Sequence, residues 1–316
     1  MSISCLKNPD SHFKSRKVQY LQDTESALKP KKHLGQVFLK NKTFLNKIIK
    51  AGDISEKDLV VEIGPGTGIL TEALLKTGAK VIAVEKDSQL VQFLKNRFHD
   101  NSNLAIIEGD IRDLLNSNFQ FLISKQIPDS KLQIPNSNYK VVGNIPYYLT
   151  SHLIQLLLEL KHQPQVIVLM IQKEVAQRII AQPPKMNLLA ASVQFFTQPE
   201  IISSVPKGAF WPQPKVDSAI IKLTLINTDK NTDNTELTLI NTDKNTDYTD
   251  KKSFFRVVKA GFSHPRKLLI SNLSQNLKIP KEQLEKVFQK LNLELNTRAQ
   301  NLSLNDWKQL TKFLFN

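Results

Sequence analysis

The residues best suited to chemistry lie just after apolar runs that predict strands. Glu62-Ile-Gly64-Pro-Gly66-Thr-Gly68 follows the run DLVV and precedes a helical stretch. Glycines in such a loop let the backbone turn tightly and approach a ligand closely. Their spacing is Gly-x-Gly-x-Gly, whereas dinucleotide-binding loops have Gly-x-Gly-x-x-Gly. The loop therefore predicts a ligand-binding turn that differs from the NAD type.

Two acidic residues end the next two predicted strands. Glu85 closes KVIAVE, about 20 residues after Gly64, where a carboxylate can accept hydrogen bonds from both hydroxyls of a ribose. Asp110 closes the following strand, in EGD. The loop and these acids resemble the cofactor site of class I methyltransferases, which bind S-adenosylmethionine. In that class, an acid at the position of Asp110 accepts a hydrogen bond from the adenine amine of the cofactor.

A fourth predicted strand, YKVVG, leads into NIPYY at residues 144–148. Asn-x-Pro is ordinary turn chemistry, but these residues can also hold the amine of a planar base. The side-chain carbonyl of Asn144 and the backbone carbonyl of Ile145 are two acceptors for the amine protons, and Pro146 shapes the turn. Tyr147 can stack on one face of the base. The aromatic residue expected on the other face is Phe210, with Trp211 as the alternative.

Strands alternate with helices from residue 58 to residue 172, which predicts a parallel, doubly wound sheet. The helix SHLIQLLLELK is expected to be capped by Thr150 or Ser151. VQFFTQ (193–198) and VDSAIIKLTLI (216–226) are predicted to close the sheet as edge strands. Several short helical segments follow residue 251. The expected fold is α/β, a Rossmann-like doubly wound sheet of the class I methyltransferase type with a small C-terminal helical domain.

Three segments interrupt this order. Residues 1–28 are polar with mixed charge and are predicted to be a flexible tail, and residues 116–138 a surface insertion. Residues 223–236 and 237–250 form a tandem repeat whose Asn, Thr and Asp favour turns, as in a duplicated linker rather than a binding arm. The predicted domains are a tail (1–28), a methyltransferase domain (29–226), a polar linker (227–250) and a basic helical RNA-binding domain (251–316).

The chain of 316 residues has a net charge of +14, which favours a polyanionic partner, nucleic acid before an anionic membrane surface. Residues 29–50 contain seven lysines and no acid. Cys5 is the only cysteine, so no intramolecular disulfide or cysteine-based metal cluster is expected, and no metal cofactor. No apolar run approaches the ~18–20 residues of a membrane span, and the N-terminus lacks an apolar core like that of a secretory signal. We therefore expect a cytoplasmic monomer.

The sequence resembles the ribosomal RNA adenine dimethyltransferases, most closely their bacterial small-subunit (16S) branch. The resemblance covers about residues 29–316, apart from 116–138 and the duplicated linker. The matching segments are KKHLGQVFL (31–39), VVEIGPGTGILTEALL (60–75), VEKD (84–87), EGD (108–110), VVGNIPYYLTS (141–151), FWPQPKVDS (210–218), FSHPRKLLISNL (262–273) and RAQNLSLNDWKQL (298–310).

The resemblance implies methyl transfer from S-adenosylmethionine to the N6 amines of two adjacent adenosines. They lie in a hairpin loop near the 3′ end of 16S rRNA, within the assembling pre-30S subunit. By position, the family's cofactor contacts fall on Val37, Leu39, Gly64, Glu85, Asp110 and Asn144. Val37 stands where the family has Asn or His, and only a backbone contact survives that change. Leu268 and Pro265 replace a Thr and a basic residue of the family's motif, which weakens an RNA contact and not the chemistry.

Three other functions share parts of the pattern. The large-subunit rRNA N6-methyltransferases of macrolide resistance use the same cofactor and amine chemistry, but RAQNLSLNDWKQL favours the small-subunit branch. A non-catalytic ribosome assembly factor with this fold would not need a complete cofactor and amine pocket. A nicotinamide oxidoreductase is disfavoured by the spacing of the glycines.

Overall fold

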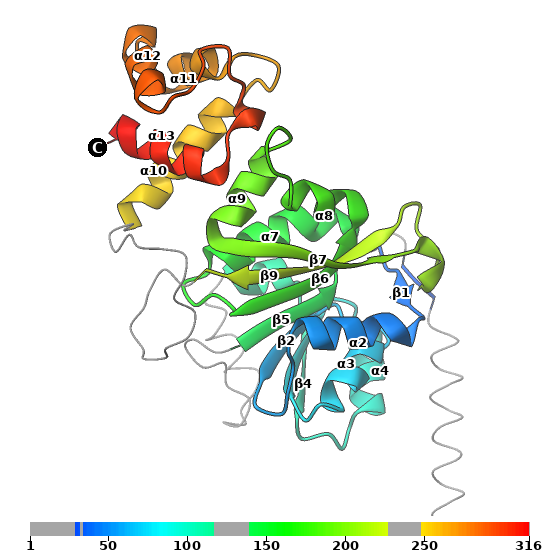
Figure 1. Cartoon of the computed structure of the whole chain (residues 1–316). Coiled ribbons are helices and arrows are strands. Elements are labelled where there is room, and N and C mark those ends of the chain that lie inside the picture. Colours follow the sequence, from blue (N-terminus) through cyan, green and yellow to red (C-terminus); the bar gives the residue numbers. More distant parts are fainter. Residues whose placement is uncertain (1–28, 32–33, 117–138, 227–247, 316) are drawn as a thin grey trace, which may run out of the picture. The chain divides into compact units, whose positions relative to one another are not determined.

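The computed structural model describes residues 29–31, 34–116, 139–226 and 248–315 (Figure 1). The predicted tail, nearly all of the 116–138 insertion and most of the duplicated linker lie outside these residues. Contacts divide the chain into two compact units. The first comprises Met1–Ile171 and Ser203–Ile220, and the second comprises Gln172–Ile202 and Ile221–Asn316. The predicted domain boundaries at residue 28 and within 227–250 fall in or beside stretches that the structure does not describe, and they stay predictions.

Within the described residues, seven strands form one sheet in the order β4-β3-β2-β5-β6-β9-β7. The pairs β2–β3, β3–β4, β2–β5 and β5–β6 are parallel, as predicted. All of β2 is buried, because helices cover both faces of the sheet, and its sequence LVVEI is accordingly apolar except for Glu62. The strands are β2 (Leu59–Ile63), β3 (Lys80–Glu85), β4 (Leu104–Glu108), β5 (Tyr139–Asn144), β6 (Val166–Gln172), β7 (Thr197–Val205) and β9 (Ser218–Leu225).

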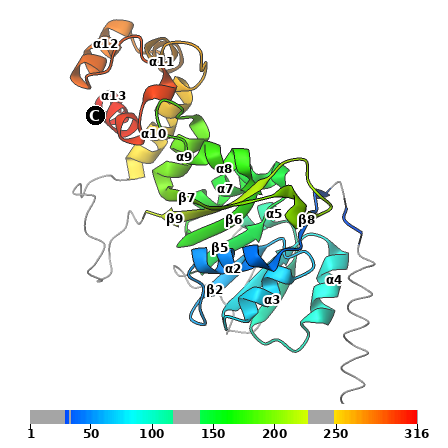
Figure 2. The ribbon, with the colours of Figure 1, turned by 45° about the vertical axis from the view of Figure 1, so that its right-hand side comes forward.

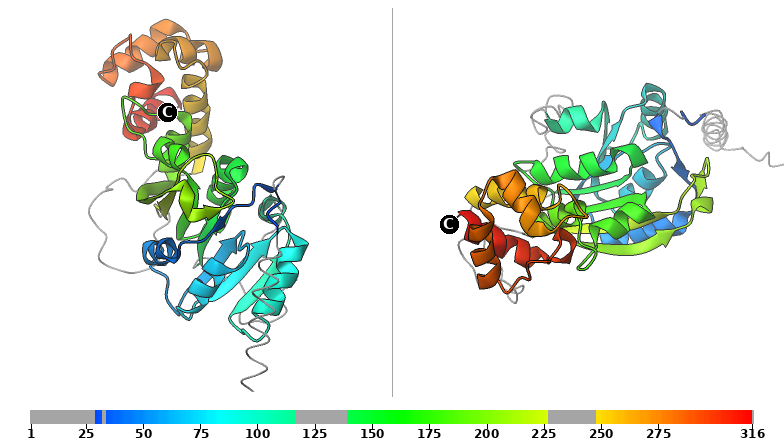
Figure 3. Two further views of the ribbon diagram at one scale, coloured as in Figure 1. Left: turned by 90° about the vertical axis from the view of Figure 1, so that its right-hand side faces the viewer. Right: turned by 90° about the horizontal axis from the view of Figure 1, so that it is seen from above.

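The helices of the first unit pack in two layers. α2 packs against α3, and α5 packs against α7 on the opposite face of the sheet (Figure 3). These helices and the one between them are α2 (Lys42–Ala51), α3 (Ile69–Leu75), α4 (Ser88–Arg97), α5 (Ile111–Asn116) and α7 (Thr150–Glu159). This layering confirms the doubly wound arrangement. None of the helices in the described part of the chain is long and apolar enough to cross a membrane.

The predicted cap of α7 is wrong. A short 3-10 turn, Tyr147–Leu149, runs directly into the helix, and Leu149 precedes it without a side-chain cap. Thr150 is therefore already helical, and its backbone N–H donates to the carbonyl of Tyr147. The turn supplies the acceptor that a capping hydroxyl would otherwise provide.

The two predicted edge strands also need correction. VQFF ends helix α9 (Leu188–Phe196), which begins where the side chain of Asn187 accepts the N–H of Ala190. Phe195 stacks on Phe254 with 4.2 Å between ring centroids, so this aromatic run serves helix packing. VDSAIIKLTLI does form β9, but β9 lies between β6 and β7 and is an inner strand; the two edges of the sheet are β7 and β4. Residues Ala219–Ile221 of β9 are fully buried, as an inner strand requires.

The second unit has its own helical core, as predicted for the chain after residue 251. Helix α8 (Lys173–Ile179) precedes α9, and the rest of the unit is mainly α10 (Tyr248–Gly261), α11 (Leu269–Leu277), α12 (Lys281–Lys290) and α13 (Leu304–Phe315). Trp307 is fully buried at the centre of this core, against Phe262. Gly261 lets the indole of Trp307 pack against the backbone, because a Cβ built there would lie 2.3 Å from the ring.

A two-stranded sheet brings distant segments of the first unit together. β1 (Phe38–Leu39) runs antiparallel to β8 (Phe210–Trp211), which is labelled in Figure 2. In this pairing Phe38 lies opposite Trp211 and Leu39 opposite Phe210. The N–H of Lys40 extends the pairing by donating to the carbonyl of Ala209. Residues 38–40, just before α2, are therefore fixed beside the FWPQP segment.

Candidate active site

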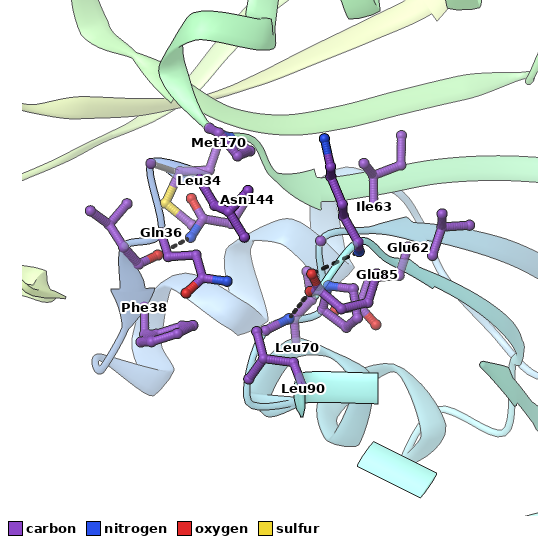
Figure 4. A pocket seen from close by; sticks show the side chains of 18 of the residues that line it. Leu34, Gln36, Phe38, Glu62, Ile63, Leu70, Glu85, Leu90, Asn144 and Met170 are labelled. Carbon is purple, nitrogen blue, oxygen red and sulfur yellow. Dashed lines mark hydrogen bonds between the residues drawn. The ribbon is translucent and has the colours of Figure 1, made fainter. Parts of the chain in front are cut away.

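A pocket of about 1050 Å³, including its open mouth, lies at the carboxyl ends of the parallel strands. It falls where β2 pairs with β3 on one side and β5 on the other, the position at which doubly wound sheets bind ligands. Residues 34–39 form another wall. Figure 4 shows that Asn144, Gln36 and Glu85 point into the pocket from different elements.

The glycine loop between β2 and α3 forms the floor of the pocket. Gly64, Gly66 and Gly68 have φ values of 68°, 58° and 81°, in the left-handed region that favours glycine. A Cβ on Gly66 would lie 3.1 Å from the ring of Phe38. The sequence therefore needs glycine both for the turn and for the close approach of its neighbours.

Glu85 is held at the end of β3 by backbone donors. Its Oε1 accepts the N–H groups of Lys86 and Asp87 at 2.8 and 2.9 Å, and its Oε2 accepts that of Gly66 at 3.2 Å. Burial raises the pKa of this carboxyl, and the three backbone N–H groups oppose that shift. The carboxylate is thereby aimed into the pocket with acceptor capacity left for a ligand.

Asp110, just beyond β4, is bound by two cations. Arg112 donates from Nε to Oδ1 at 3.0 Å and from Nη2 to Oδ2 at 2.6 Å, and Lys86 Nζ lies 2.9 Å from Oδ2. The hydrogen bonds from Arg112, together with that from Lys86, hold the pKa of Asp110 well below its usual range. A ligand amine at this carboxylate shares it with these cations or displaces one of them.

Glu62 is a further acid against the pocket, buried at 1% exposure. The hydroxyl of Thr71 donates to its Oε2 at 2.6 Å, whereas Oε1 has no hydrogen-bond partner within the described residues. Burial raises the pKa of Glu62 to about 8. The side chain is therefore mostly protonated at neutral pH, and it can donate or accept a hydrogen bond.

The NIPYY segment is fixed by hydrogen bonds on both sides. The Nδ2 of Asn144 donates to the carbonyl of Val37 at 2.8 Å, and the N–H of Ile145 donates to the carbonyl of Met170 at 3.2 Å. Since a carbonyl only accepts, the amide nitrogen must face Val37, and Oδ1 turns away from it. The half-buried Tyr147 shares a hydrogen bond of 2.9 Å with Ser218, and burial raises the pKa of its phenol.

The pocket brings together most of the predicted site residues and leaves others outside its lining. Pro146 lines it together with the predicted cofactor contacts Val37, Leu39, Gly64, Glu85, Asp110 and Asn144. Ile145 is fully buried and Tyr147 is half-buried, and neither is among the residues that line the pocket. Phe210 is 3% exposed and packed away from it, whereas Trp211 is 43% exposed. The roles assigned to all these residues stay predictions.

Sequence reasoning missed a cluster that holds residues 34–39 at the pocket. Oδ1 of Asp87 accepts from Lys31 Nζ at 2.7 Å, and Oδ2 accepts from Gln36 Nε2 at 3.0 Å. Gln36 in turn accepts the N–H of Lys31 at 2.8 Å. Burial opposes ionisation of Asp87, but the bonds from Lys31 and Gln36 outweigh it and lower its pKa. The available signal was the position of Asp87 at the start of α4, which it caps.

Four strand ends thus converge on one pocket, with a glycine loop that lacks the pyrophosphate-binding spacing. This is the arrangement of the S-adenosylmethionine-dependent class I methyltransferases, and the protein belongs to that class. The chain is a member of the ribosomal RNA adenine dimethylase family, whose pattern matches residues 27–316.

Sequence and structural relatives agree with this membership. The chain is 38% identical over 283 residues to the ribosomal RNA small subunit methyltransferase A of Dehalococcoides mccartyi, covering 90% of this chain and 88% of the relative. It is 35% identical over 286 residues to that of Bacillus licheniformis, covering 89% and 90%.

Two solved structures share the fold. A dimethyladenosine transferase from Plasmodium falciparum superposes with a TM-score of 0.65 at 28% identity, covering 86% of this chain and 95% of that one. The 23S rRNA methyltransferase ErmE superposes with a TM-score of 0.64 at 20% identity, covering 88% and 100%.

Proposed function

We propose that this protein dimethylates the N6 amines of two adjacent adenosines in the loop of a hairpin near the 3′ end of 16S rRNA. Its substrate would be the assembling small ribosomal subunit in the cytoplasm. The supporting relatives are the small-subunit enzymes that share 35–38% identity with nearly the whole chain. The observation that carries the chemistry is the orientation of Asn144 by the carbonyl of Val37.

The residues of the pocket fit S-adenosylmethionine. Glu85 presents a carboxylate where a ribose would lie, Asp110 a carboxylate for an adenine amine, and the glycine loop an open backbone surface. When bound, the cofactor supplies an electrophilic methyl group. The chain then has to hold the target amine in line with that group and keep its lone pair available.

Asn144 and Ile145 are proposed to hold the target amine. An exocyclic amine is a weak nucleophile while its lone pair is conjugated with the base. Two acceptors, Oδ1 of Asn144 and the carbonyl of Ile145, would bind its two protons and favour the pyramidal form. Because both groups are held by hydrogen bonds to Val37 and Met170, little reorganisation is needed when the base arrives. The proton released after methyl transfer would leave to water.

Tyr147 and Phe210 are proposed to sandwich the target base. The bond from Tyr147 to Ser218 fixes the tyrosine ring. Phe210 is buried in β8, so it would have to turn outward to reach a base.

The direct test is mass spectrometry of rRNA fragments after incubation of the protein with S-adenosylmethionine and unmodified small subunits. We expect two adjacent dimethyladenosines in one fragment near the 3′ end of 16S rRNA. Large subunits serve as the parallel substrate. Methylation confined to large-subunit rRNA would contradict the substrate, and no methylation of either subunit would contradict the activity.

A further inference from the structure

Trp211 stands out as an exposed aromatic residue beside the pocket that the proposed chemistry does not use. It is 43% exposed although it is one of only two tryptophans in the chain, and the other, Trp307, is fully buried. Its ring stacks on Phe38 with 6.4 Å between centroids and 27° between planes. Phe38 in turn lines the pocket and touches the glycine loop. The two stacked rings therefore extend from the pocket, at Phe38, to the exposed surface, at Trp211.

A lysine lies over the ring of Trp211. Lys40 Nζ lies 5.7 Å from the centroid of the Trp211 ring, and the backbone bond from Lys40 to Ala209 fixes the residue beside β8. Lys207 and Lys215 are also exposed on the segments that flank Trp211. Asp217 is the acid on this stretch, and it accepts the backbone N–H of Lys207. The surroundings of the ring therefore carry net positive charge.

We propose that Trp211 stacks on an unpaired base next to the target adenosine, with Lys40 on the phosphate of that nucleotide. This inference rests on the proposed function, because it places the neighbouring base one step outside the pocket that holds the target. An exposed indole beside a lysine suits single-stranded RNA, since every base has a π-face and every nucleotide a phosphate. Packing on Phe38 holds the indole in place, so it loses little freedom on binding.

The RNA that Trp211 would contact is therefore a loop with its bases unstacked. A base inside a helix offers no free face to Trp211, whereas a loop base does. Stacking of this kind tolerates any base, so Trp211 contributes to affinity and to the choice of loop over stem and not to sequence reading.

Fluorescence of the full-length protein tests the contact directly. Titration with a short single-stranded RNA should quench the emission of Trp211 and protect it from acrylamide, whereas a duplex of the same length should not. In Trp211→Phe the remaining emission comes from the buried Trp307 and should not respond. Unchanged emission of the wild-type protein at saturating single-stranded RNA would overturn the proposal.

Kinetics on unmodified small subunits provide the second measurement. Trp211→Leu should raise KM for the subunit about tenfold, with kcat within about twofold, and Trp211→Phe should raise it less. Val216→Ala, on an exposed apolar residue of the same segment, is the matched control and should leave KM unchanged. Calorimetry with S-adenosylhomocysteine should give the same affinity for all these variants.

The two measurements separate this inference from the proposed function. If the wild-type protein does not methylate small subunits, the proposed function fails, while the fluorescence titration still decides whether Trp211 stacks on RNA. If methylation proceeds and Trp211→Leu has the wild-type KM, the stacking proposal fails alone. If the Leu variant does not fold, the wild-type fluorescence and the Phe variant decide.

Discussion

The side-chain amide of Asn144 donates a hydrogen bond to the backbone carbonyl of Val37, with 2.8 Å between nitrogen and oxygen. The two residues belong to the end of β5 and to the segment before β1, so the bond joins the two walls of the pocket. It also leaves Oδ1 of Asn144 as the end of the amide that can accept from a target amine. The contact uses only the backbone of Val37, which is why a valine serves at this position.

Asn144→Ala removes both the acceptor and its orientation. We expect kcat to fall about 10²–10³-fold, the usual effect of deleting one oriented polar group at a transition state. Single-turnover methylation of small subunits measures this. Asn103→Ala is the matched control, because it removes a hydrogen bond from the side-chain amide of Asn103 to the carbonyl of Gly78, away from the pocket. Equal losses in the two variants would mean that Asn144 acts only through stability.

Glu85→Gln should weaken binding of S-adenosylhomocysteine by about tenfold or more. Both oxygens of Glu85 accept backbone N–H groups, so the NH₂ of a glutamine must face at least one donor. Isothermal titration calorimetry measures the affinity. Glu72→Gln, on a more exposed carboxylate paired with Lys76, should bind the ligand like the wild type. Unchanged affinity in Glu85→Gln would remove this residue from the cofactor site.

Asp87→Ala should release the segment 34–39 from the pocket. Without acceptors for Lys31 and Gln36, the segment should open more often, raising KM for the cofactor about tenfold and exposing the chain to proteolysis near residue 35. Saturating S-adenosylhomocysteine should restore protection. Asp58→Asn is the control, since Asp58 also pairs with a lysine but lies away from the segment. Identical proteolysis of wild type and Asp87→Ala would contradict the clamp.

Glu62 predicts a dependence of stability on pH. Its pKa is about 8 in the folded protein against an ordinary value of 4.5, so between these values the folded state holds a proton that the unfolded state has lost. Stability from this group is present below pH 4.5 and falls as pH rises towards 8, by about 1 kcal/mol per pH unit. In urea unfolding from pH 5 to pH 9, Glu62→Gln should therefore gain relative to wild type as pH rises. A parallel pair of curves for wild type and Glu62→Gln would contradict the assignment.

Gly261→Ala should destabilise the helical unit by about 1–3 kcal/mol. The added Cβ would meet Trp307 at 2.3 Å and Leu269 at 2.9 Å, and the buried indole cannot move aside. Unfolding followed by Trp307 fluorescence measures the loss. Gly208→Ala adds a Cβ with nothing within 4 Å and should change stability by less than about 0.5 kcal/mol. A similar stability for both variants would mean that the core around Trp307 can relax.

Local patterns predicted much of the first unit. The strands that end at Glu85 and Asn144, and the glycine loop between β2 and α3, follow from apolar periodicity and from the need for positive φ, both of which act over a few residues. The C-terminal helices were also predicted, because their apolar faces repeat at helical spacing. VQFF was mistaken for a strand because Phe and Val suit either element, and packing on Phe254 in a helix decided the case.

By itself, the sequence determined the doubly wound fold, the family and which strand ends carry polar groups, because neighbouring residues encode these features. Only the tertiary structure decided how segments far apart in the chain complete the site. It turned the amide of Asn144 towards Val37, tied Lys31 and Gln36 to Asp87, buried Phe210 and left Trp211 exposed. These outcomes depend on hydrogen bonds and strand pairing between residues 51 to 173 positions apart, which no local pattern records.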